Sequence, residues 1–278
     1  MLQTPAILFC DVDGLVPARG KIAPGFDDFS AALEHAAIPI VWVTTRTRLQ
    51  IDEPRRKLGH NHPFIAEGGC GVYLPESYFH LRPAKTVRLG RFTCLPIAEQ
   101  QPAAADALEG LSAETGVEVV ALRSLSPREL AQNSGLPAQQ AELTRHPDFD
   151  ELFFFAGAAE NDVKRFVAES GMRGWQLRQR GVLWSLAVGA NLKQCVRDLS
   201  KLYTRALRSQ PKIVGISRED DSELLATCDR GFVLVDSADA SAVEVESGRH
   251  RRPARFREIP IGSGDEWERI LEGLSGKP

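Results

Sequence analysis

Long apolar runs are missing from this 278-residue sequence, which contains nothing close to the roughly 18 consecutive apolar residues of a membrane-spanning helix. The first residues lack a basic stretch followed by an apolar core, so we expect no signal peptide. Charge of one sign is not in excess, because 34 lysines and arginines stand against 37 acidic residues and the net charge is −3. Nothing global therefore favours nucleic acid or an anionic membrane as a partner, and we expect a cytoplasmic protein.

Cysteine is also scarce. The five cysteines are scattered, form no CxxC pair and no Cys/His cluster, and are Cys10, Cys70, Cys94, Cys195 and Cys228. This pattern speaks against a zinc site and favours reduced thiols. Cys10 is flanked by apolar residues, so we expect a small core residue and not a reactive thiol.

The most informative stretch begins with an apolar run, Ala6–Cys10, that ends in two aspartates one residue apart and a glycine. The run is too short and too rich in β-forming residues for a helix, so it predicts a buried strand. The carboxyl end of such a strand is where open α/β sheets bind ligands. Residues i and i+2 of an extended chain point the same way, so Asp11 and Asp13 can converge on one centre.

Two carboxylates this close repel each other and call for a cation, for which Mg²⁺ is well suited because it prefers hard oxygen ligands and phosphate. Asp11 can then stay ionised and attack phosphorus, which gives an aspartyl-phosphate. Asp13 can donate a proton to the leaving oxygen and later take one from water. The same residues also fit a strand that ends in an ordinary Asp-Gly turn, and the tetrapeptide alone leaves both interpretations open.

Strands alternate with helices in the first and last parts of the chain, which predicts an α/β fold with a parallel sheet flanked by helices. The strands expected after the first are Ile40–Val43, Phe64–Ala66, Lys212–Ile216 and Phe232–Val235. A helical stretch to about Leu58 is expected to be started or interrupted by Pro54. An arginine-rich loop is expected up to about Arg257.

The regular alternation of strands and helices is lost between about Arg82 and Val188. This stretch predicts an inserted α+β unit near the usual size of a domain. Val87–Thr93 alternates like a single strand. Ser126-Pro127-Arg128-Glu129 is a strong helix start, with serine as cap, proline at the first helical position and glutamate at the third. Residues 1–81 and 189–278 are then the two parts of one core, and residues 82–188 form the insert.

Three further features follow apolar strands or open helices. The Thr44 hydroxyl can bind a phosphoryl oxygen, although threonine at a strand end is commonly a turn or cap residue. Lys193 can neutralise phosphoryl charge at the start of a helix, although most helix lysines are simply solvated. Asp220 and Asp221 can complete a metal site or cap the short helix that follows.

The order of these features resembles the haloacid dehalogenase-like hydrolase superfamily, and within it the mannosyl-3-phosphoglycerate phosphatase family. Gly189-Ala190-Asn191-Leu192-Lys193 is similar to the family's Gly-Ala-Asn-Asp-Lys, and Pro63–Gly69 to its Pro-Phe-Ile-x-Glu-Asn-Gly. The other segments that carry the resemblance are Phe9–Gly14, Ile38–Arg48, Leu125–Ala141, Asp148–Phe153 and Gly264–Trp267. Together they span nearly the whole chain.

The resemblance implies a Rossmann-like core with a mobile C2-type cap, and a Mg²⁺-dependent phosphomonoester hydrolase. It implies Asp11 as nucleophile and Asp13 as general acid/base. Its phosphate-binding residues are Thr44 and Lys193, its other substrate-binding residues are Thr45, Arg46 and Arg145, and its metal ligands are Asp11, Asp13, Asp220 and Asp221. The implied substrate is a small phosphorylated sugar or sugar acid, such as a glycosyl-3-phosphoglycerate.

The departures from the family fall on functional positions. Leu15 stands where a threonine is usual after the Asp-Gly pair, and Ser217 stands where a metal-binding aspartate belongs. A neutral hydroxyl is a poorer Mg²⁺ ligand than a carboxylate. These changes keep open a binding or regulatory protein that retained the fold and lost catalysis. A phosphomutase that shares the fold is a third possibility.

A basic run extends from Arg249 to Arg257. This basic run can bind an anionic ligand or nucleic acid. A solvated loop is the interpretation that the slightly negative net charge favours.

Overall fold

The computed structural model describes residues 5–17, 21–80, 83–218, 223–236 and 255–274. The contacts within the chain divide it into two compact units. One unit comprises Met1–Pro17, Lys21–Val43 and Val196–Pro278, and the other comprises Ala18–Gly20 and Thr44–Cys195. The insert boundaries that the sequence predicts, at residues 82 and 188, differ from these limits and remain a proposal.

The first unit contains parallel strands in the order β13-β12-β11-β1-β2. They are β1 (Ala6–Asp11), β2 (Ile40–Val43), β11 (Lys212–Ser217), β12 (Arg230–Asp236) and β13 (Phe256–Ile261). Its helices are α1 (Phe26–His35), α8 (Glu223–Ala226) and α10 (Glu266–Leu274). Helix α7 (Leu192–Leu207) begins in the second unit and continues in the first.

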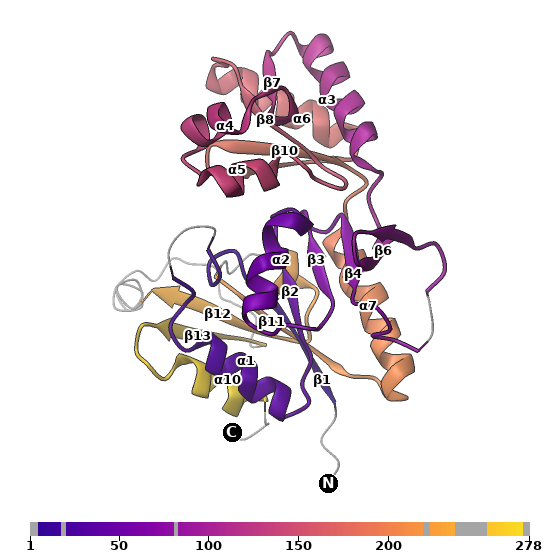
Figure 1. The fold of residues 1–278 in the computed structure, drawn as a ribbon, viewed down its shortest axis with the longest axis vertical. Coiled ribbons are helices and arrows are strands. Elements are labelled where there is room, and N and C mark those ends of the chain that lie inside the picture. The colour runs from indigo at the N-terminus through magenta and orange to yellow at the C-terminus, as the bar shows by residue number, and fades with distance from the viewer. Residues whose placement is uncertain (1–4, 18–20, 81–82, 219–222, 237–254, 275–278) are drawn as a thin grey trace. The chain divides into compact units, whose positions relative to one another are not determined.

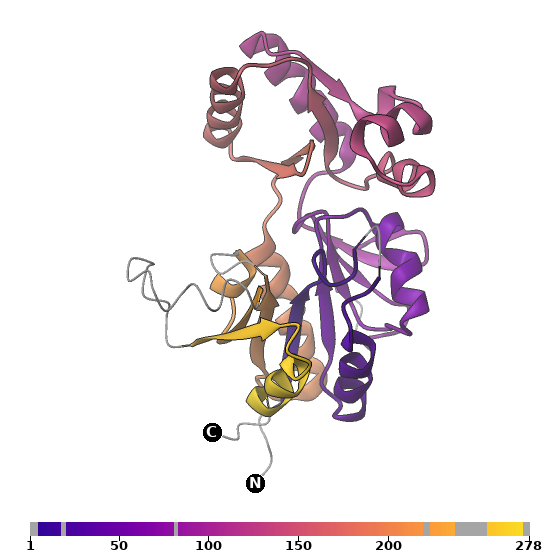
Figure 2. The same cartoon turned by 90° about the vertical axis from the view of Figure 1, so that its left-hand side faces the viewer.

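Strand β1 is the centre of this sheet because it pairs with β11 on one side and β2 on the other. The apolar residues Ile7 to Cys10 are fully buried, as expected for a strand covered on both faces. Helices α1 and α10 lie side by side against the sheet (Figure 1, Figure 2), where the ring of Trp267 stacks 4.8 Å from that of Phe29. The Trp267 indole N–H also donates to the carbonyl of Pro24 at 2.7 Å.

The second unit contains two groups of antiparallel strands, of which the second is a separate four-stranded sheet. The first has the order β3-β4-β6-β5, with β3 (Phe64–Ala66), β4 (Gly71–Leu74), β5 (Val87–Leu89) and β6 (Phe92–Pro96), and follows α2 (Arg48–Lys57). The second has the order β7-β8-β10-β9, with β7 (Val119–Ala121), β8 (Glu151–Phe155), β9 (Trp175–Arg180) and β10 (Leu183–Val188).

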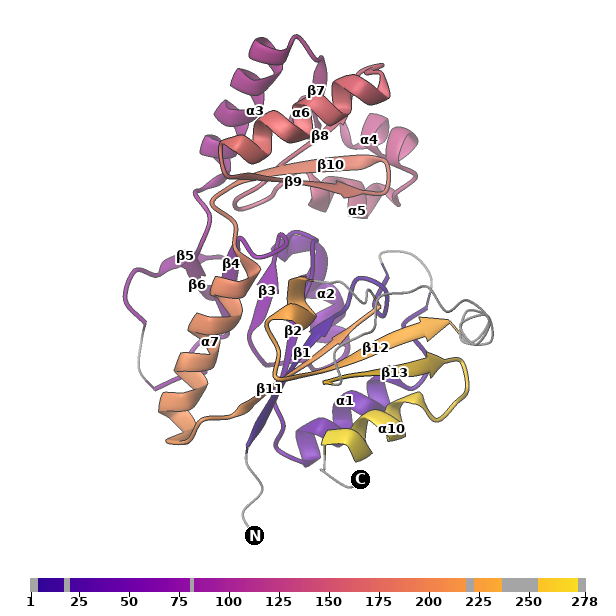
Figure 3. The same ribbon diagram turned by 180° about the vertical axis from the view of Figure 1, so that it is seen from behind.

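Helices cover this separate four-stranded sheet. Helices α3 (Gln101–Thr115) and α6 (Glu160–Met172) lie over it (Figure 3), where Leu108, Phe166 and Phe153 belong to one buried cluster. The remaining short helices are η1 (Leu122–Ser124), α4 (Pro127–Ser134) and α5 (Ala138–Thr144). Residues of β8, α4 and α5 form a further buried cluster, so residues 101–188 have a hydrophobic core of their own.

The α/β fold with a parallel sheet, flanking helices and an inserted α+β part is confirmed. Two local predictions were wrong. Val87–Thr93 is two strands, β5 and β6, because Gly90 takes a left-handed φ of 57° that turns the chain back into a hairpin. Pro54 lies inside α2, which begins earlier, at a capping box between Thr47 and Gln50. The arginine-rich loop expected up to about Arg257 lies mostly outside the described residues, and β13 begins near its expected end.

Within the described residues, none of the helices combines the length and apolar character that crossing a bilayer demands. All five cysteines lie within the described residues, where each is buried and none forms a disulfide. Burial raises the pKa of the Cys10 thiol well above its usual value, with repulsion from Asp11 adding to the effect. The prediction that Cys10 is a core residue is therefore confirmed.

Candidate active site

Asp11 is the last residue of β1, and the sheet register places the end of β11 beside it. Cys10 pairs with Ile216, so Ser217 lies next along the neighbouring strand. The Ser217 hydroxyl donates to Asp11 Oδ2 at 3.3 Å, and the backbone N–H of Asp13 donates to Asp11 Oδ1 at 3.1 Å. Both oxygens of the Asp11 carboxylate are thus oriented by the chain itself.

The two residues that depart from the family pattern are both buried. Ser217 is 0% exposed, and Leu15 is 1% exposed and belongs to the core of the first unit. Leu15 therefore serves packing, and its backbone carbonyl accepts the N–H of Ala23 at 2.8 Å. Ser217 instead supplies a hydroxyl at the position from which the family presents a carboxylate.

Arg218 is a neighbour of this site that the sequence did not single out. Its aliphatic chain covers Gly14 so closely that a Cβ at Gly14 would collide with it. Its guanidinium reaches Asp236 at the end of β12, where Nη2 lies 2.7 Å from Asp236 Oδ1. The sequence alone does not show that Arg218 covers the Asp-Gly turn, because this contact depends on how β11 and β12 pair in the fold.

The donor set at this end of the sheet fits a hard cation. Asp11 and Asp13 present carboxylate and carbonyl oxygens, and Mg²⁺ is commonly held by one or two carboxylates together with water and phosphate oxygens. The described residues contain no group of three or more His, Cys, Asp or Glu side chains that could hold a metal. The two other predicted ligands, Asp220 and Asp221, lie outside the described residues.

Thr44 directly follows β2 and opens the second unit. It is 2% exposed, and its hydroxyl oxygen accepts the backbone N–H of Arg46 at 3.1 Å. The Arg46 Nε atom also approaches this oxygen, at 3.4 Å. In both contacts the hydroxyl oxygen acts as the acceptor. The neighbouring Thr45 is half-buried.

Lys193 is the second residue of α7 and is exposed. The helix start is fixed by Asn191, whose side-chain oxygen accepts the backbone N–H of Gln194 at 2.8 Å. The predicted helix opening is confirmed. A lysine in the first turn combines its own charge with the positive end of the helix, which suits an anion.

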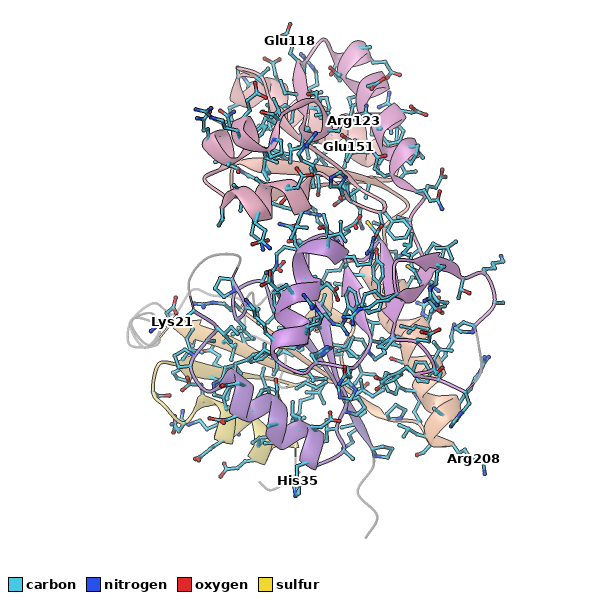
Figure 4. The ribbon with its side chains drawn as sticks, in the orientation of Figure 1. Lys21, His35, Glu118, Arg123, Glu151 and Arg208 are labelled. Atoms are coloured by element: carbon cyan, nitrogen blue, oxygen red, sulfur yellow. The ribbon has the colours of Figure 1, made fainter. Side chains whose placement is uncertain are left out.

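Arg145 follows α5, where its Nη1 lies 3.2 Å from Glu142 Oε2 and its Nη2 donates to the carbonyl of Arg123 at 3.3 Å. Its Nε is buried and has no hydrogen-bond partner among the described residues. Figure 4 shows Arg123 beside Glu151, with 3.6 Å between Arg123 Nε and Glu151 Oε1. Burial raises the pKa of the Glu151 carboxyl.

A dense polar cluster surrounds Glu67, to which the sequence gave no role. The Glu67 side chain is 1% exposed, and its two oxygens accept three successive backbone N–H groups, those of residues 148 to 150, at 2.8 to 3.0 Å. Asp148 is held by Arg48 at 2.8 Å and by the Tyr73 hydroxyl at 2.8 Å. Asp150 forms an ion pair with Arg180 of β9.

The candidate residues thus fall into two groups. Asp11, Asp13 and Ser217 come together in the first unit, whereas Thr44 to Arg46, Arg145 and Lys193 belong to the second. The assembly of both groups into one site remains a proposal.

Comparison with known proteins identifies the class to which this fold belongs. A haloacid dehalogenase-like hydrolase from B. subtilis has a similar structure, with a TM-score of 0.62 and 13% identity over 98% of this chain and 99% of that one. The chain therefore has the fold of the haloacid dehalogenase-like hydrolases. No family model matches the sequence.

Two curated relatives narrow the comparison. The glucosyl-3-phosphoglycerate/mannosyl-3-phosphoglycerate phosphatase of Methanococcoides burtonii is 21% identical over 231 residues, which are 82% of this chain and 84% of the relative. A phosphatase with the same name from Persephonella marina is 24% identical over 222 residues, which are 77% and 79% of the two chains. The resemblance that the sequence motifs indicated is confirmed.

Proposed function

We propose that this protein is a Mg²⁺-dependent phosphomonoester hydrolase that acts through an aspartyl-phosphate on a small sugar or glycerate phosphate. The observation that carries the proposal is the half-buried Asp11 carboxylate, which lies at the end of a central strand and is oriented through both of its oxygens. The names of the curated relatives support a glycosyl-3-phosphoglycerate, such as mannosyl-3-phosphoglycerate, as the substrate.

In the proposed reaction, an Asp11 oxygen attacks phosphorus and the ester oxygen leaves. Asp13 gives the leaving oxygen a proton and takes one from the water that later hydrolyses the aspartyl-phosphate. Thr44 donates its hydroxyl proton to a phosphoryl oxygen, and Lys193 offsets the phosphoryl charge. Chain connectivity supports a common site, because Val43, the register partner of Asp11, directly precedes Thr44.

Mg²⁺ would be held by the Asp11 carboxylate and the Asp13 carbonyl, with Asp220 or Asp221 as further ligands, and would lower the repulsion between Asp11 and the phosphoryl oxygens. Thr45, Arg46 and Arg145 are proposed to contact the rest of the substrate. The positive charges of the two arginines suit the carboxylate of a sugar acid.

Replacement of the nucleophile tests the proposal. Asp11→Asn is expected to reduce Mg²⁺-dependent phosphate release from a panel of sugar and glycerate phosphates to background, because an amide cannot form the acyl phosphate. Asp27→Asn, an exposed acid on α1, is the matched control and should keep full activity. Equal release by wild type and Asp11→Asn removes Asp11 from the nucleophile role.

A second function, binding or regulation without catalysis, is favoured by one observation: the Ser217 hydroxyl occupies Asp11 Oδ2 where a further carboxylate is expected. Calorimetric titration with Mg²⁺, combined with the same substrate panel, separates the two functions. Metal binding with turnover rejects the binding protein. Absence of both at millimolar Mg²⁺ supports it.

A further inference from the structure

The Glu67 cluster belongs to a turn that touches three separate segments of the second unit. The turn consists of Glu67, Gly68 and Gly69 and follows β3 directly. All three residues have left-handed backbone conformations, with φ of 52°, 63° and 101°. Glutamate rarely adopts such a conformation, so the surrounding contacts must hold it there.

One face of the turn binds the segment after β2. The N–H of Gly68 donates to the carbonyl of Thr44 at 3.0 Å, and the N–H of Glu67 donates to the carbonyl of Arg46 at 3.1 Å. The N–H of Thr44 in turn donates to the carbonyl of Ile65 at 3.0 Å. The backbone of Thr44 is therefore fixed by the end of β3 and by the turn.

The other end of the turn binds the start of α7. The carbonyl of Gly69 accepts the N–H of Asn191 at 3.0 Å and the thiol of Cys195 at 3.2 Å. A Cβ at Gly69 would lie 2.6 Å from the backbone nitrogen of Leu192, so only glycine allows this approach. The position of Lys193, the next residue, thus depends on the turn.

The side chain of Glu67 connects the turn to the inserted part of the chain. Its three N–H donors come from consecutive residues, 148 to 150, immediately before β8. Arg178 of β9 closes the same turn from outside by donating to the Gly68 carbonyl. The Glu67 carboxyl group is buried and accepts three backbone hydrogen bonds, so this connection is stiff.

We propose that Glu67 is a positioning residue: its carboxylate fixes segment 148–150 onto the turn Glu67–Gly69, and the turn sets the spacing between Thr44 and Lys193. The inference rests on the proposed function, which assigns Thr44 and Lys193 to the phosphoryl group. A movement of residues 148–150 would then displace Thr44 and Lys193 through the side chain of Glu67.

A comparison of hydrogen exchange in the wild type and in Glu67→Gln tests the connection between segment 148–150 and the turn. Glu67→Gln keeps the side-chain shape but must point its NH₂ group at one of the N–H donors. We expect exchange about tenfold faster in segment 148–150, the size that follows when one buried N–H loses its acceptor. We also expect faster exchange at the amides of Gly68 and Asn191, which report the contacts to Thr44 and α7.

Two further variants keep the test decisive. Glu118→Gln, at the labelled outer end of the inserted part in Figure 4, is the matched control and should change none of these amides. Tyr73→Phe removes one hydrogen bond to Asp148 and keeps the ring that stacks on Phe64, so it serves if Glu67→Gln does not fold. Faster exchange confined to residues 148–150 in whichever variant folds overturns the proposal.

Kinetics provide the second measurement. For Glu67→Gln we expect kcat for phosphate release to fall about tenfold with little change in KM, because misplaced phosphate ligands weaken the transition state. An unchanged kcat contradicts the positioning role. If the wild type releases no phosphate from any substrate, the proposed function fails, whereas the exchange comparison still decides whether Glu67 connects the three segments.

Discussion

At the scale of single residues, the hydrogen bond from Ser217 to Asp11 decides what the first unit can bind. Ser217 is fully buried, and its hydroxyl donates to the Asp11 carboxylate. A carboxylate at this position would repel Asp11 in the absence of a cation and add a ligand in its presence. If the proposed function holds, serine at this position would lower the affinity for Mg²⁺ and would avoid the repulsion when no metal is bound.

Ser217→Asp tests how the serine affects Mg²⁺ affinity and stability without metal. We expect the variant to unfold at a lower temperature than wild type in EDTA, because two carboxylates then meet without charge compensation. Addition of millimolar Mg²⁺ should raise its unfolding temperature more than that of wild type, and the Mg²⁺ concentration for half-maximal phosphate release should fall about tenfold, equivalent to about 1.4 kcal/mol. Ser217→Asn is the uncharged control. An identical response of wild type and Ser217→Asp to Mg²⁺ contradicts the idea.

At the scale of helices and strands, locally encoded elements could be predicted and those fixed by distant partners could not. The start of α4 was readable because Ser126 and Glu129 cap the helix within four residues. Strand β9 has only two apolar residues, Trp175 and Leu177. Its Arg178 and Arg180 find their partners at Gly68 and Asp150, far away in the sequence. The candidate site divides in the same way: Asp11 stands out beside an apolar run, whereas Glu67 acquires its role only when residues 148–150 fold onto it.

The capping box of α4 yields a prediction for stability. Ser126→Ala removes the oxygen that accepts the Glu129 N–H at 3.3 Å, and we expect a loss of about 1 kcal/mol in the free energy of unfolding, measured in urea. Gln132→Ala, on the exposed side of the same helix, is the control and should be nearly neutral. Equal stability of Ser126→Ala and wild type would show that the cap contributes nothing.

At the scale of the whole molecule, buried carboxyls make stability depend on pH. Burial and the neighbouring Asp150 raise the pKa of Glu67 to about 8, and burial also raises the pKa of Asp150. Asp150 Oδ1 has no hydrogen-bond partner among the described residues, and a proton on Glu67 would supply one. The other groups whose charges face this pair are Arg48, Cys70, Tyr73, Cys94, Asp148, Arg178 and Arg180.

A carboxyl with a raised pKa binds its proton more tightly in the folded state than in the unfolded one. Its contribution to stability is therefore complete below the unfolded-state pKa of about 4.3 and is lost as the pH rises towards about 8. We expect the free energy of unfolding in urea to decline over this range in the wild type. Glu67→Gln, which has no proton to lose, should show a flatter profile, and parallel profiles for the two proteins would contradict the assignment.

The burial of all five thiols has a further consequence, because an alkylating reagent can reach a cysteine only when the chain around it opens. Cys10 and Cys228 report on one compact unit, and Cys70, Cys94 and Cys195 on the other. Pulse alkylation in dilute urea, followed by mass spectrometry, therefore shows which of the two units opens first. Modification of both sets at one common rate would mean that the halves open together.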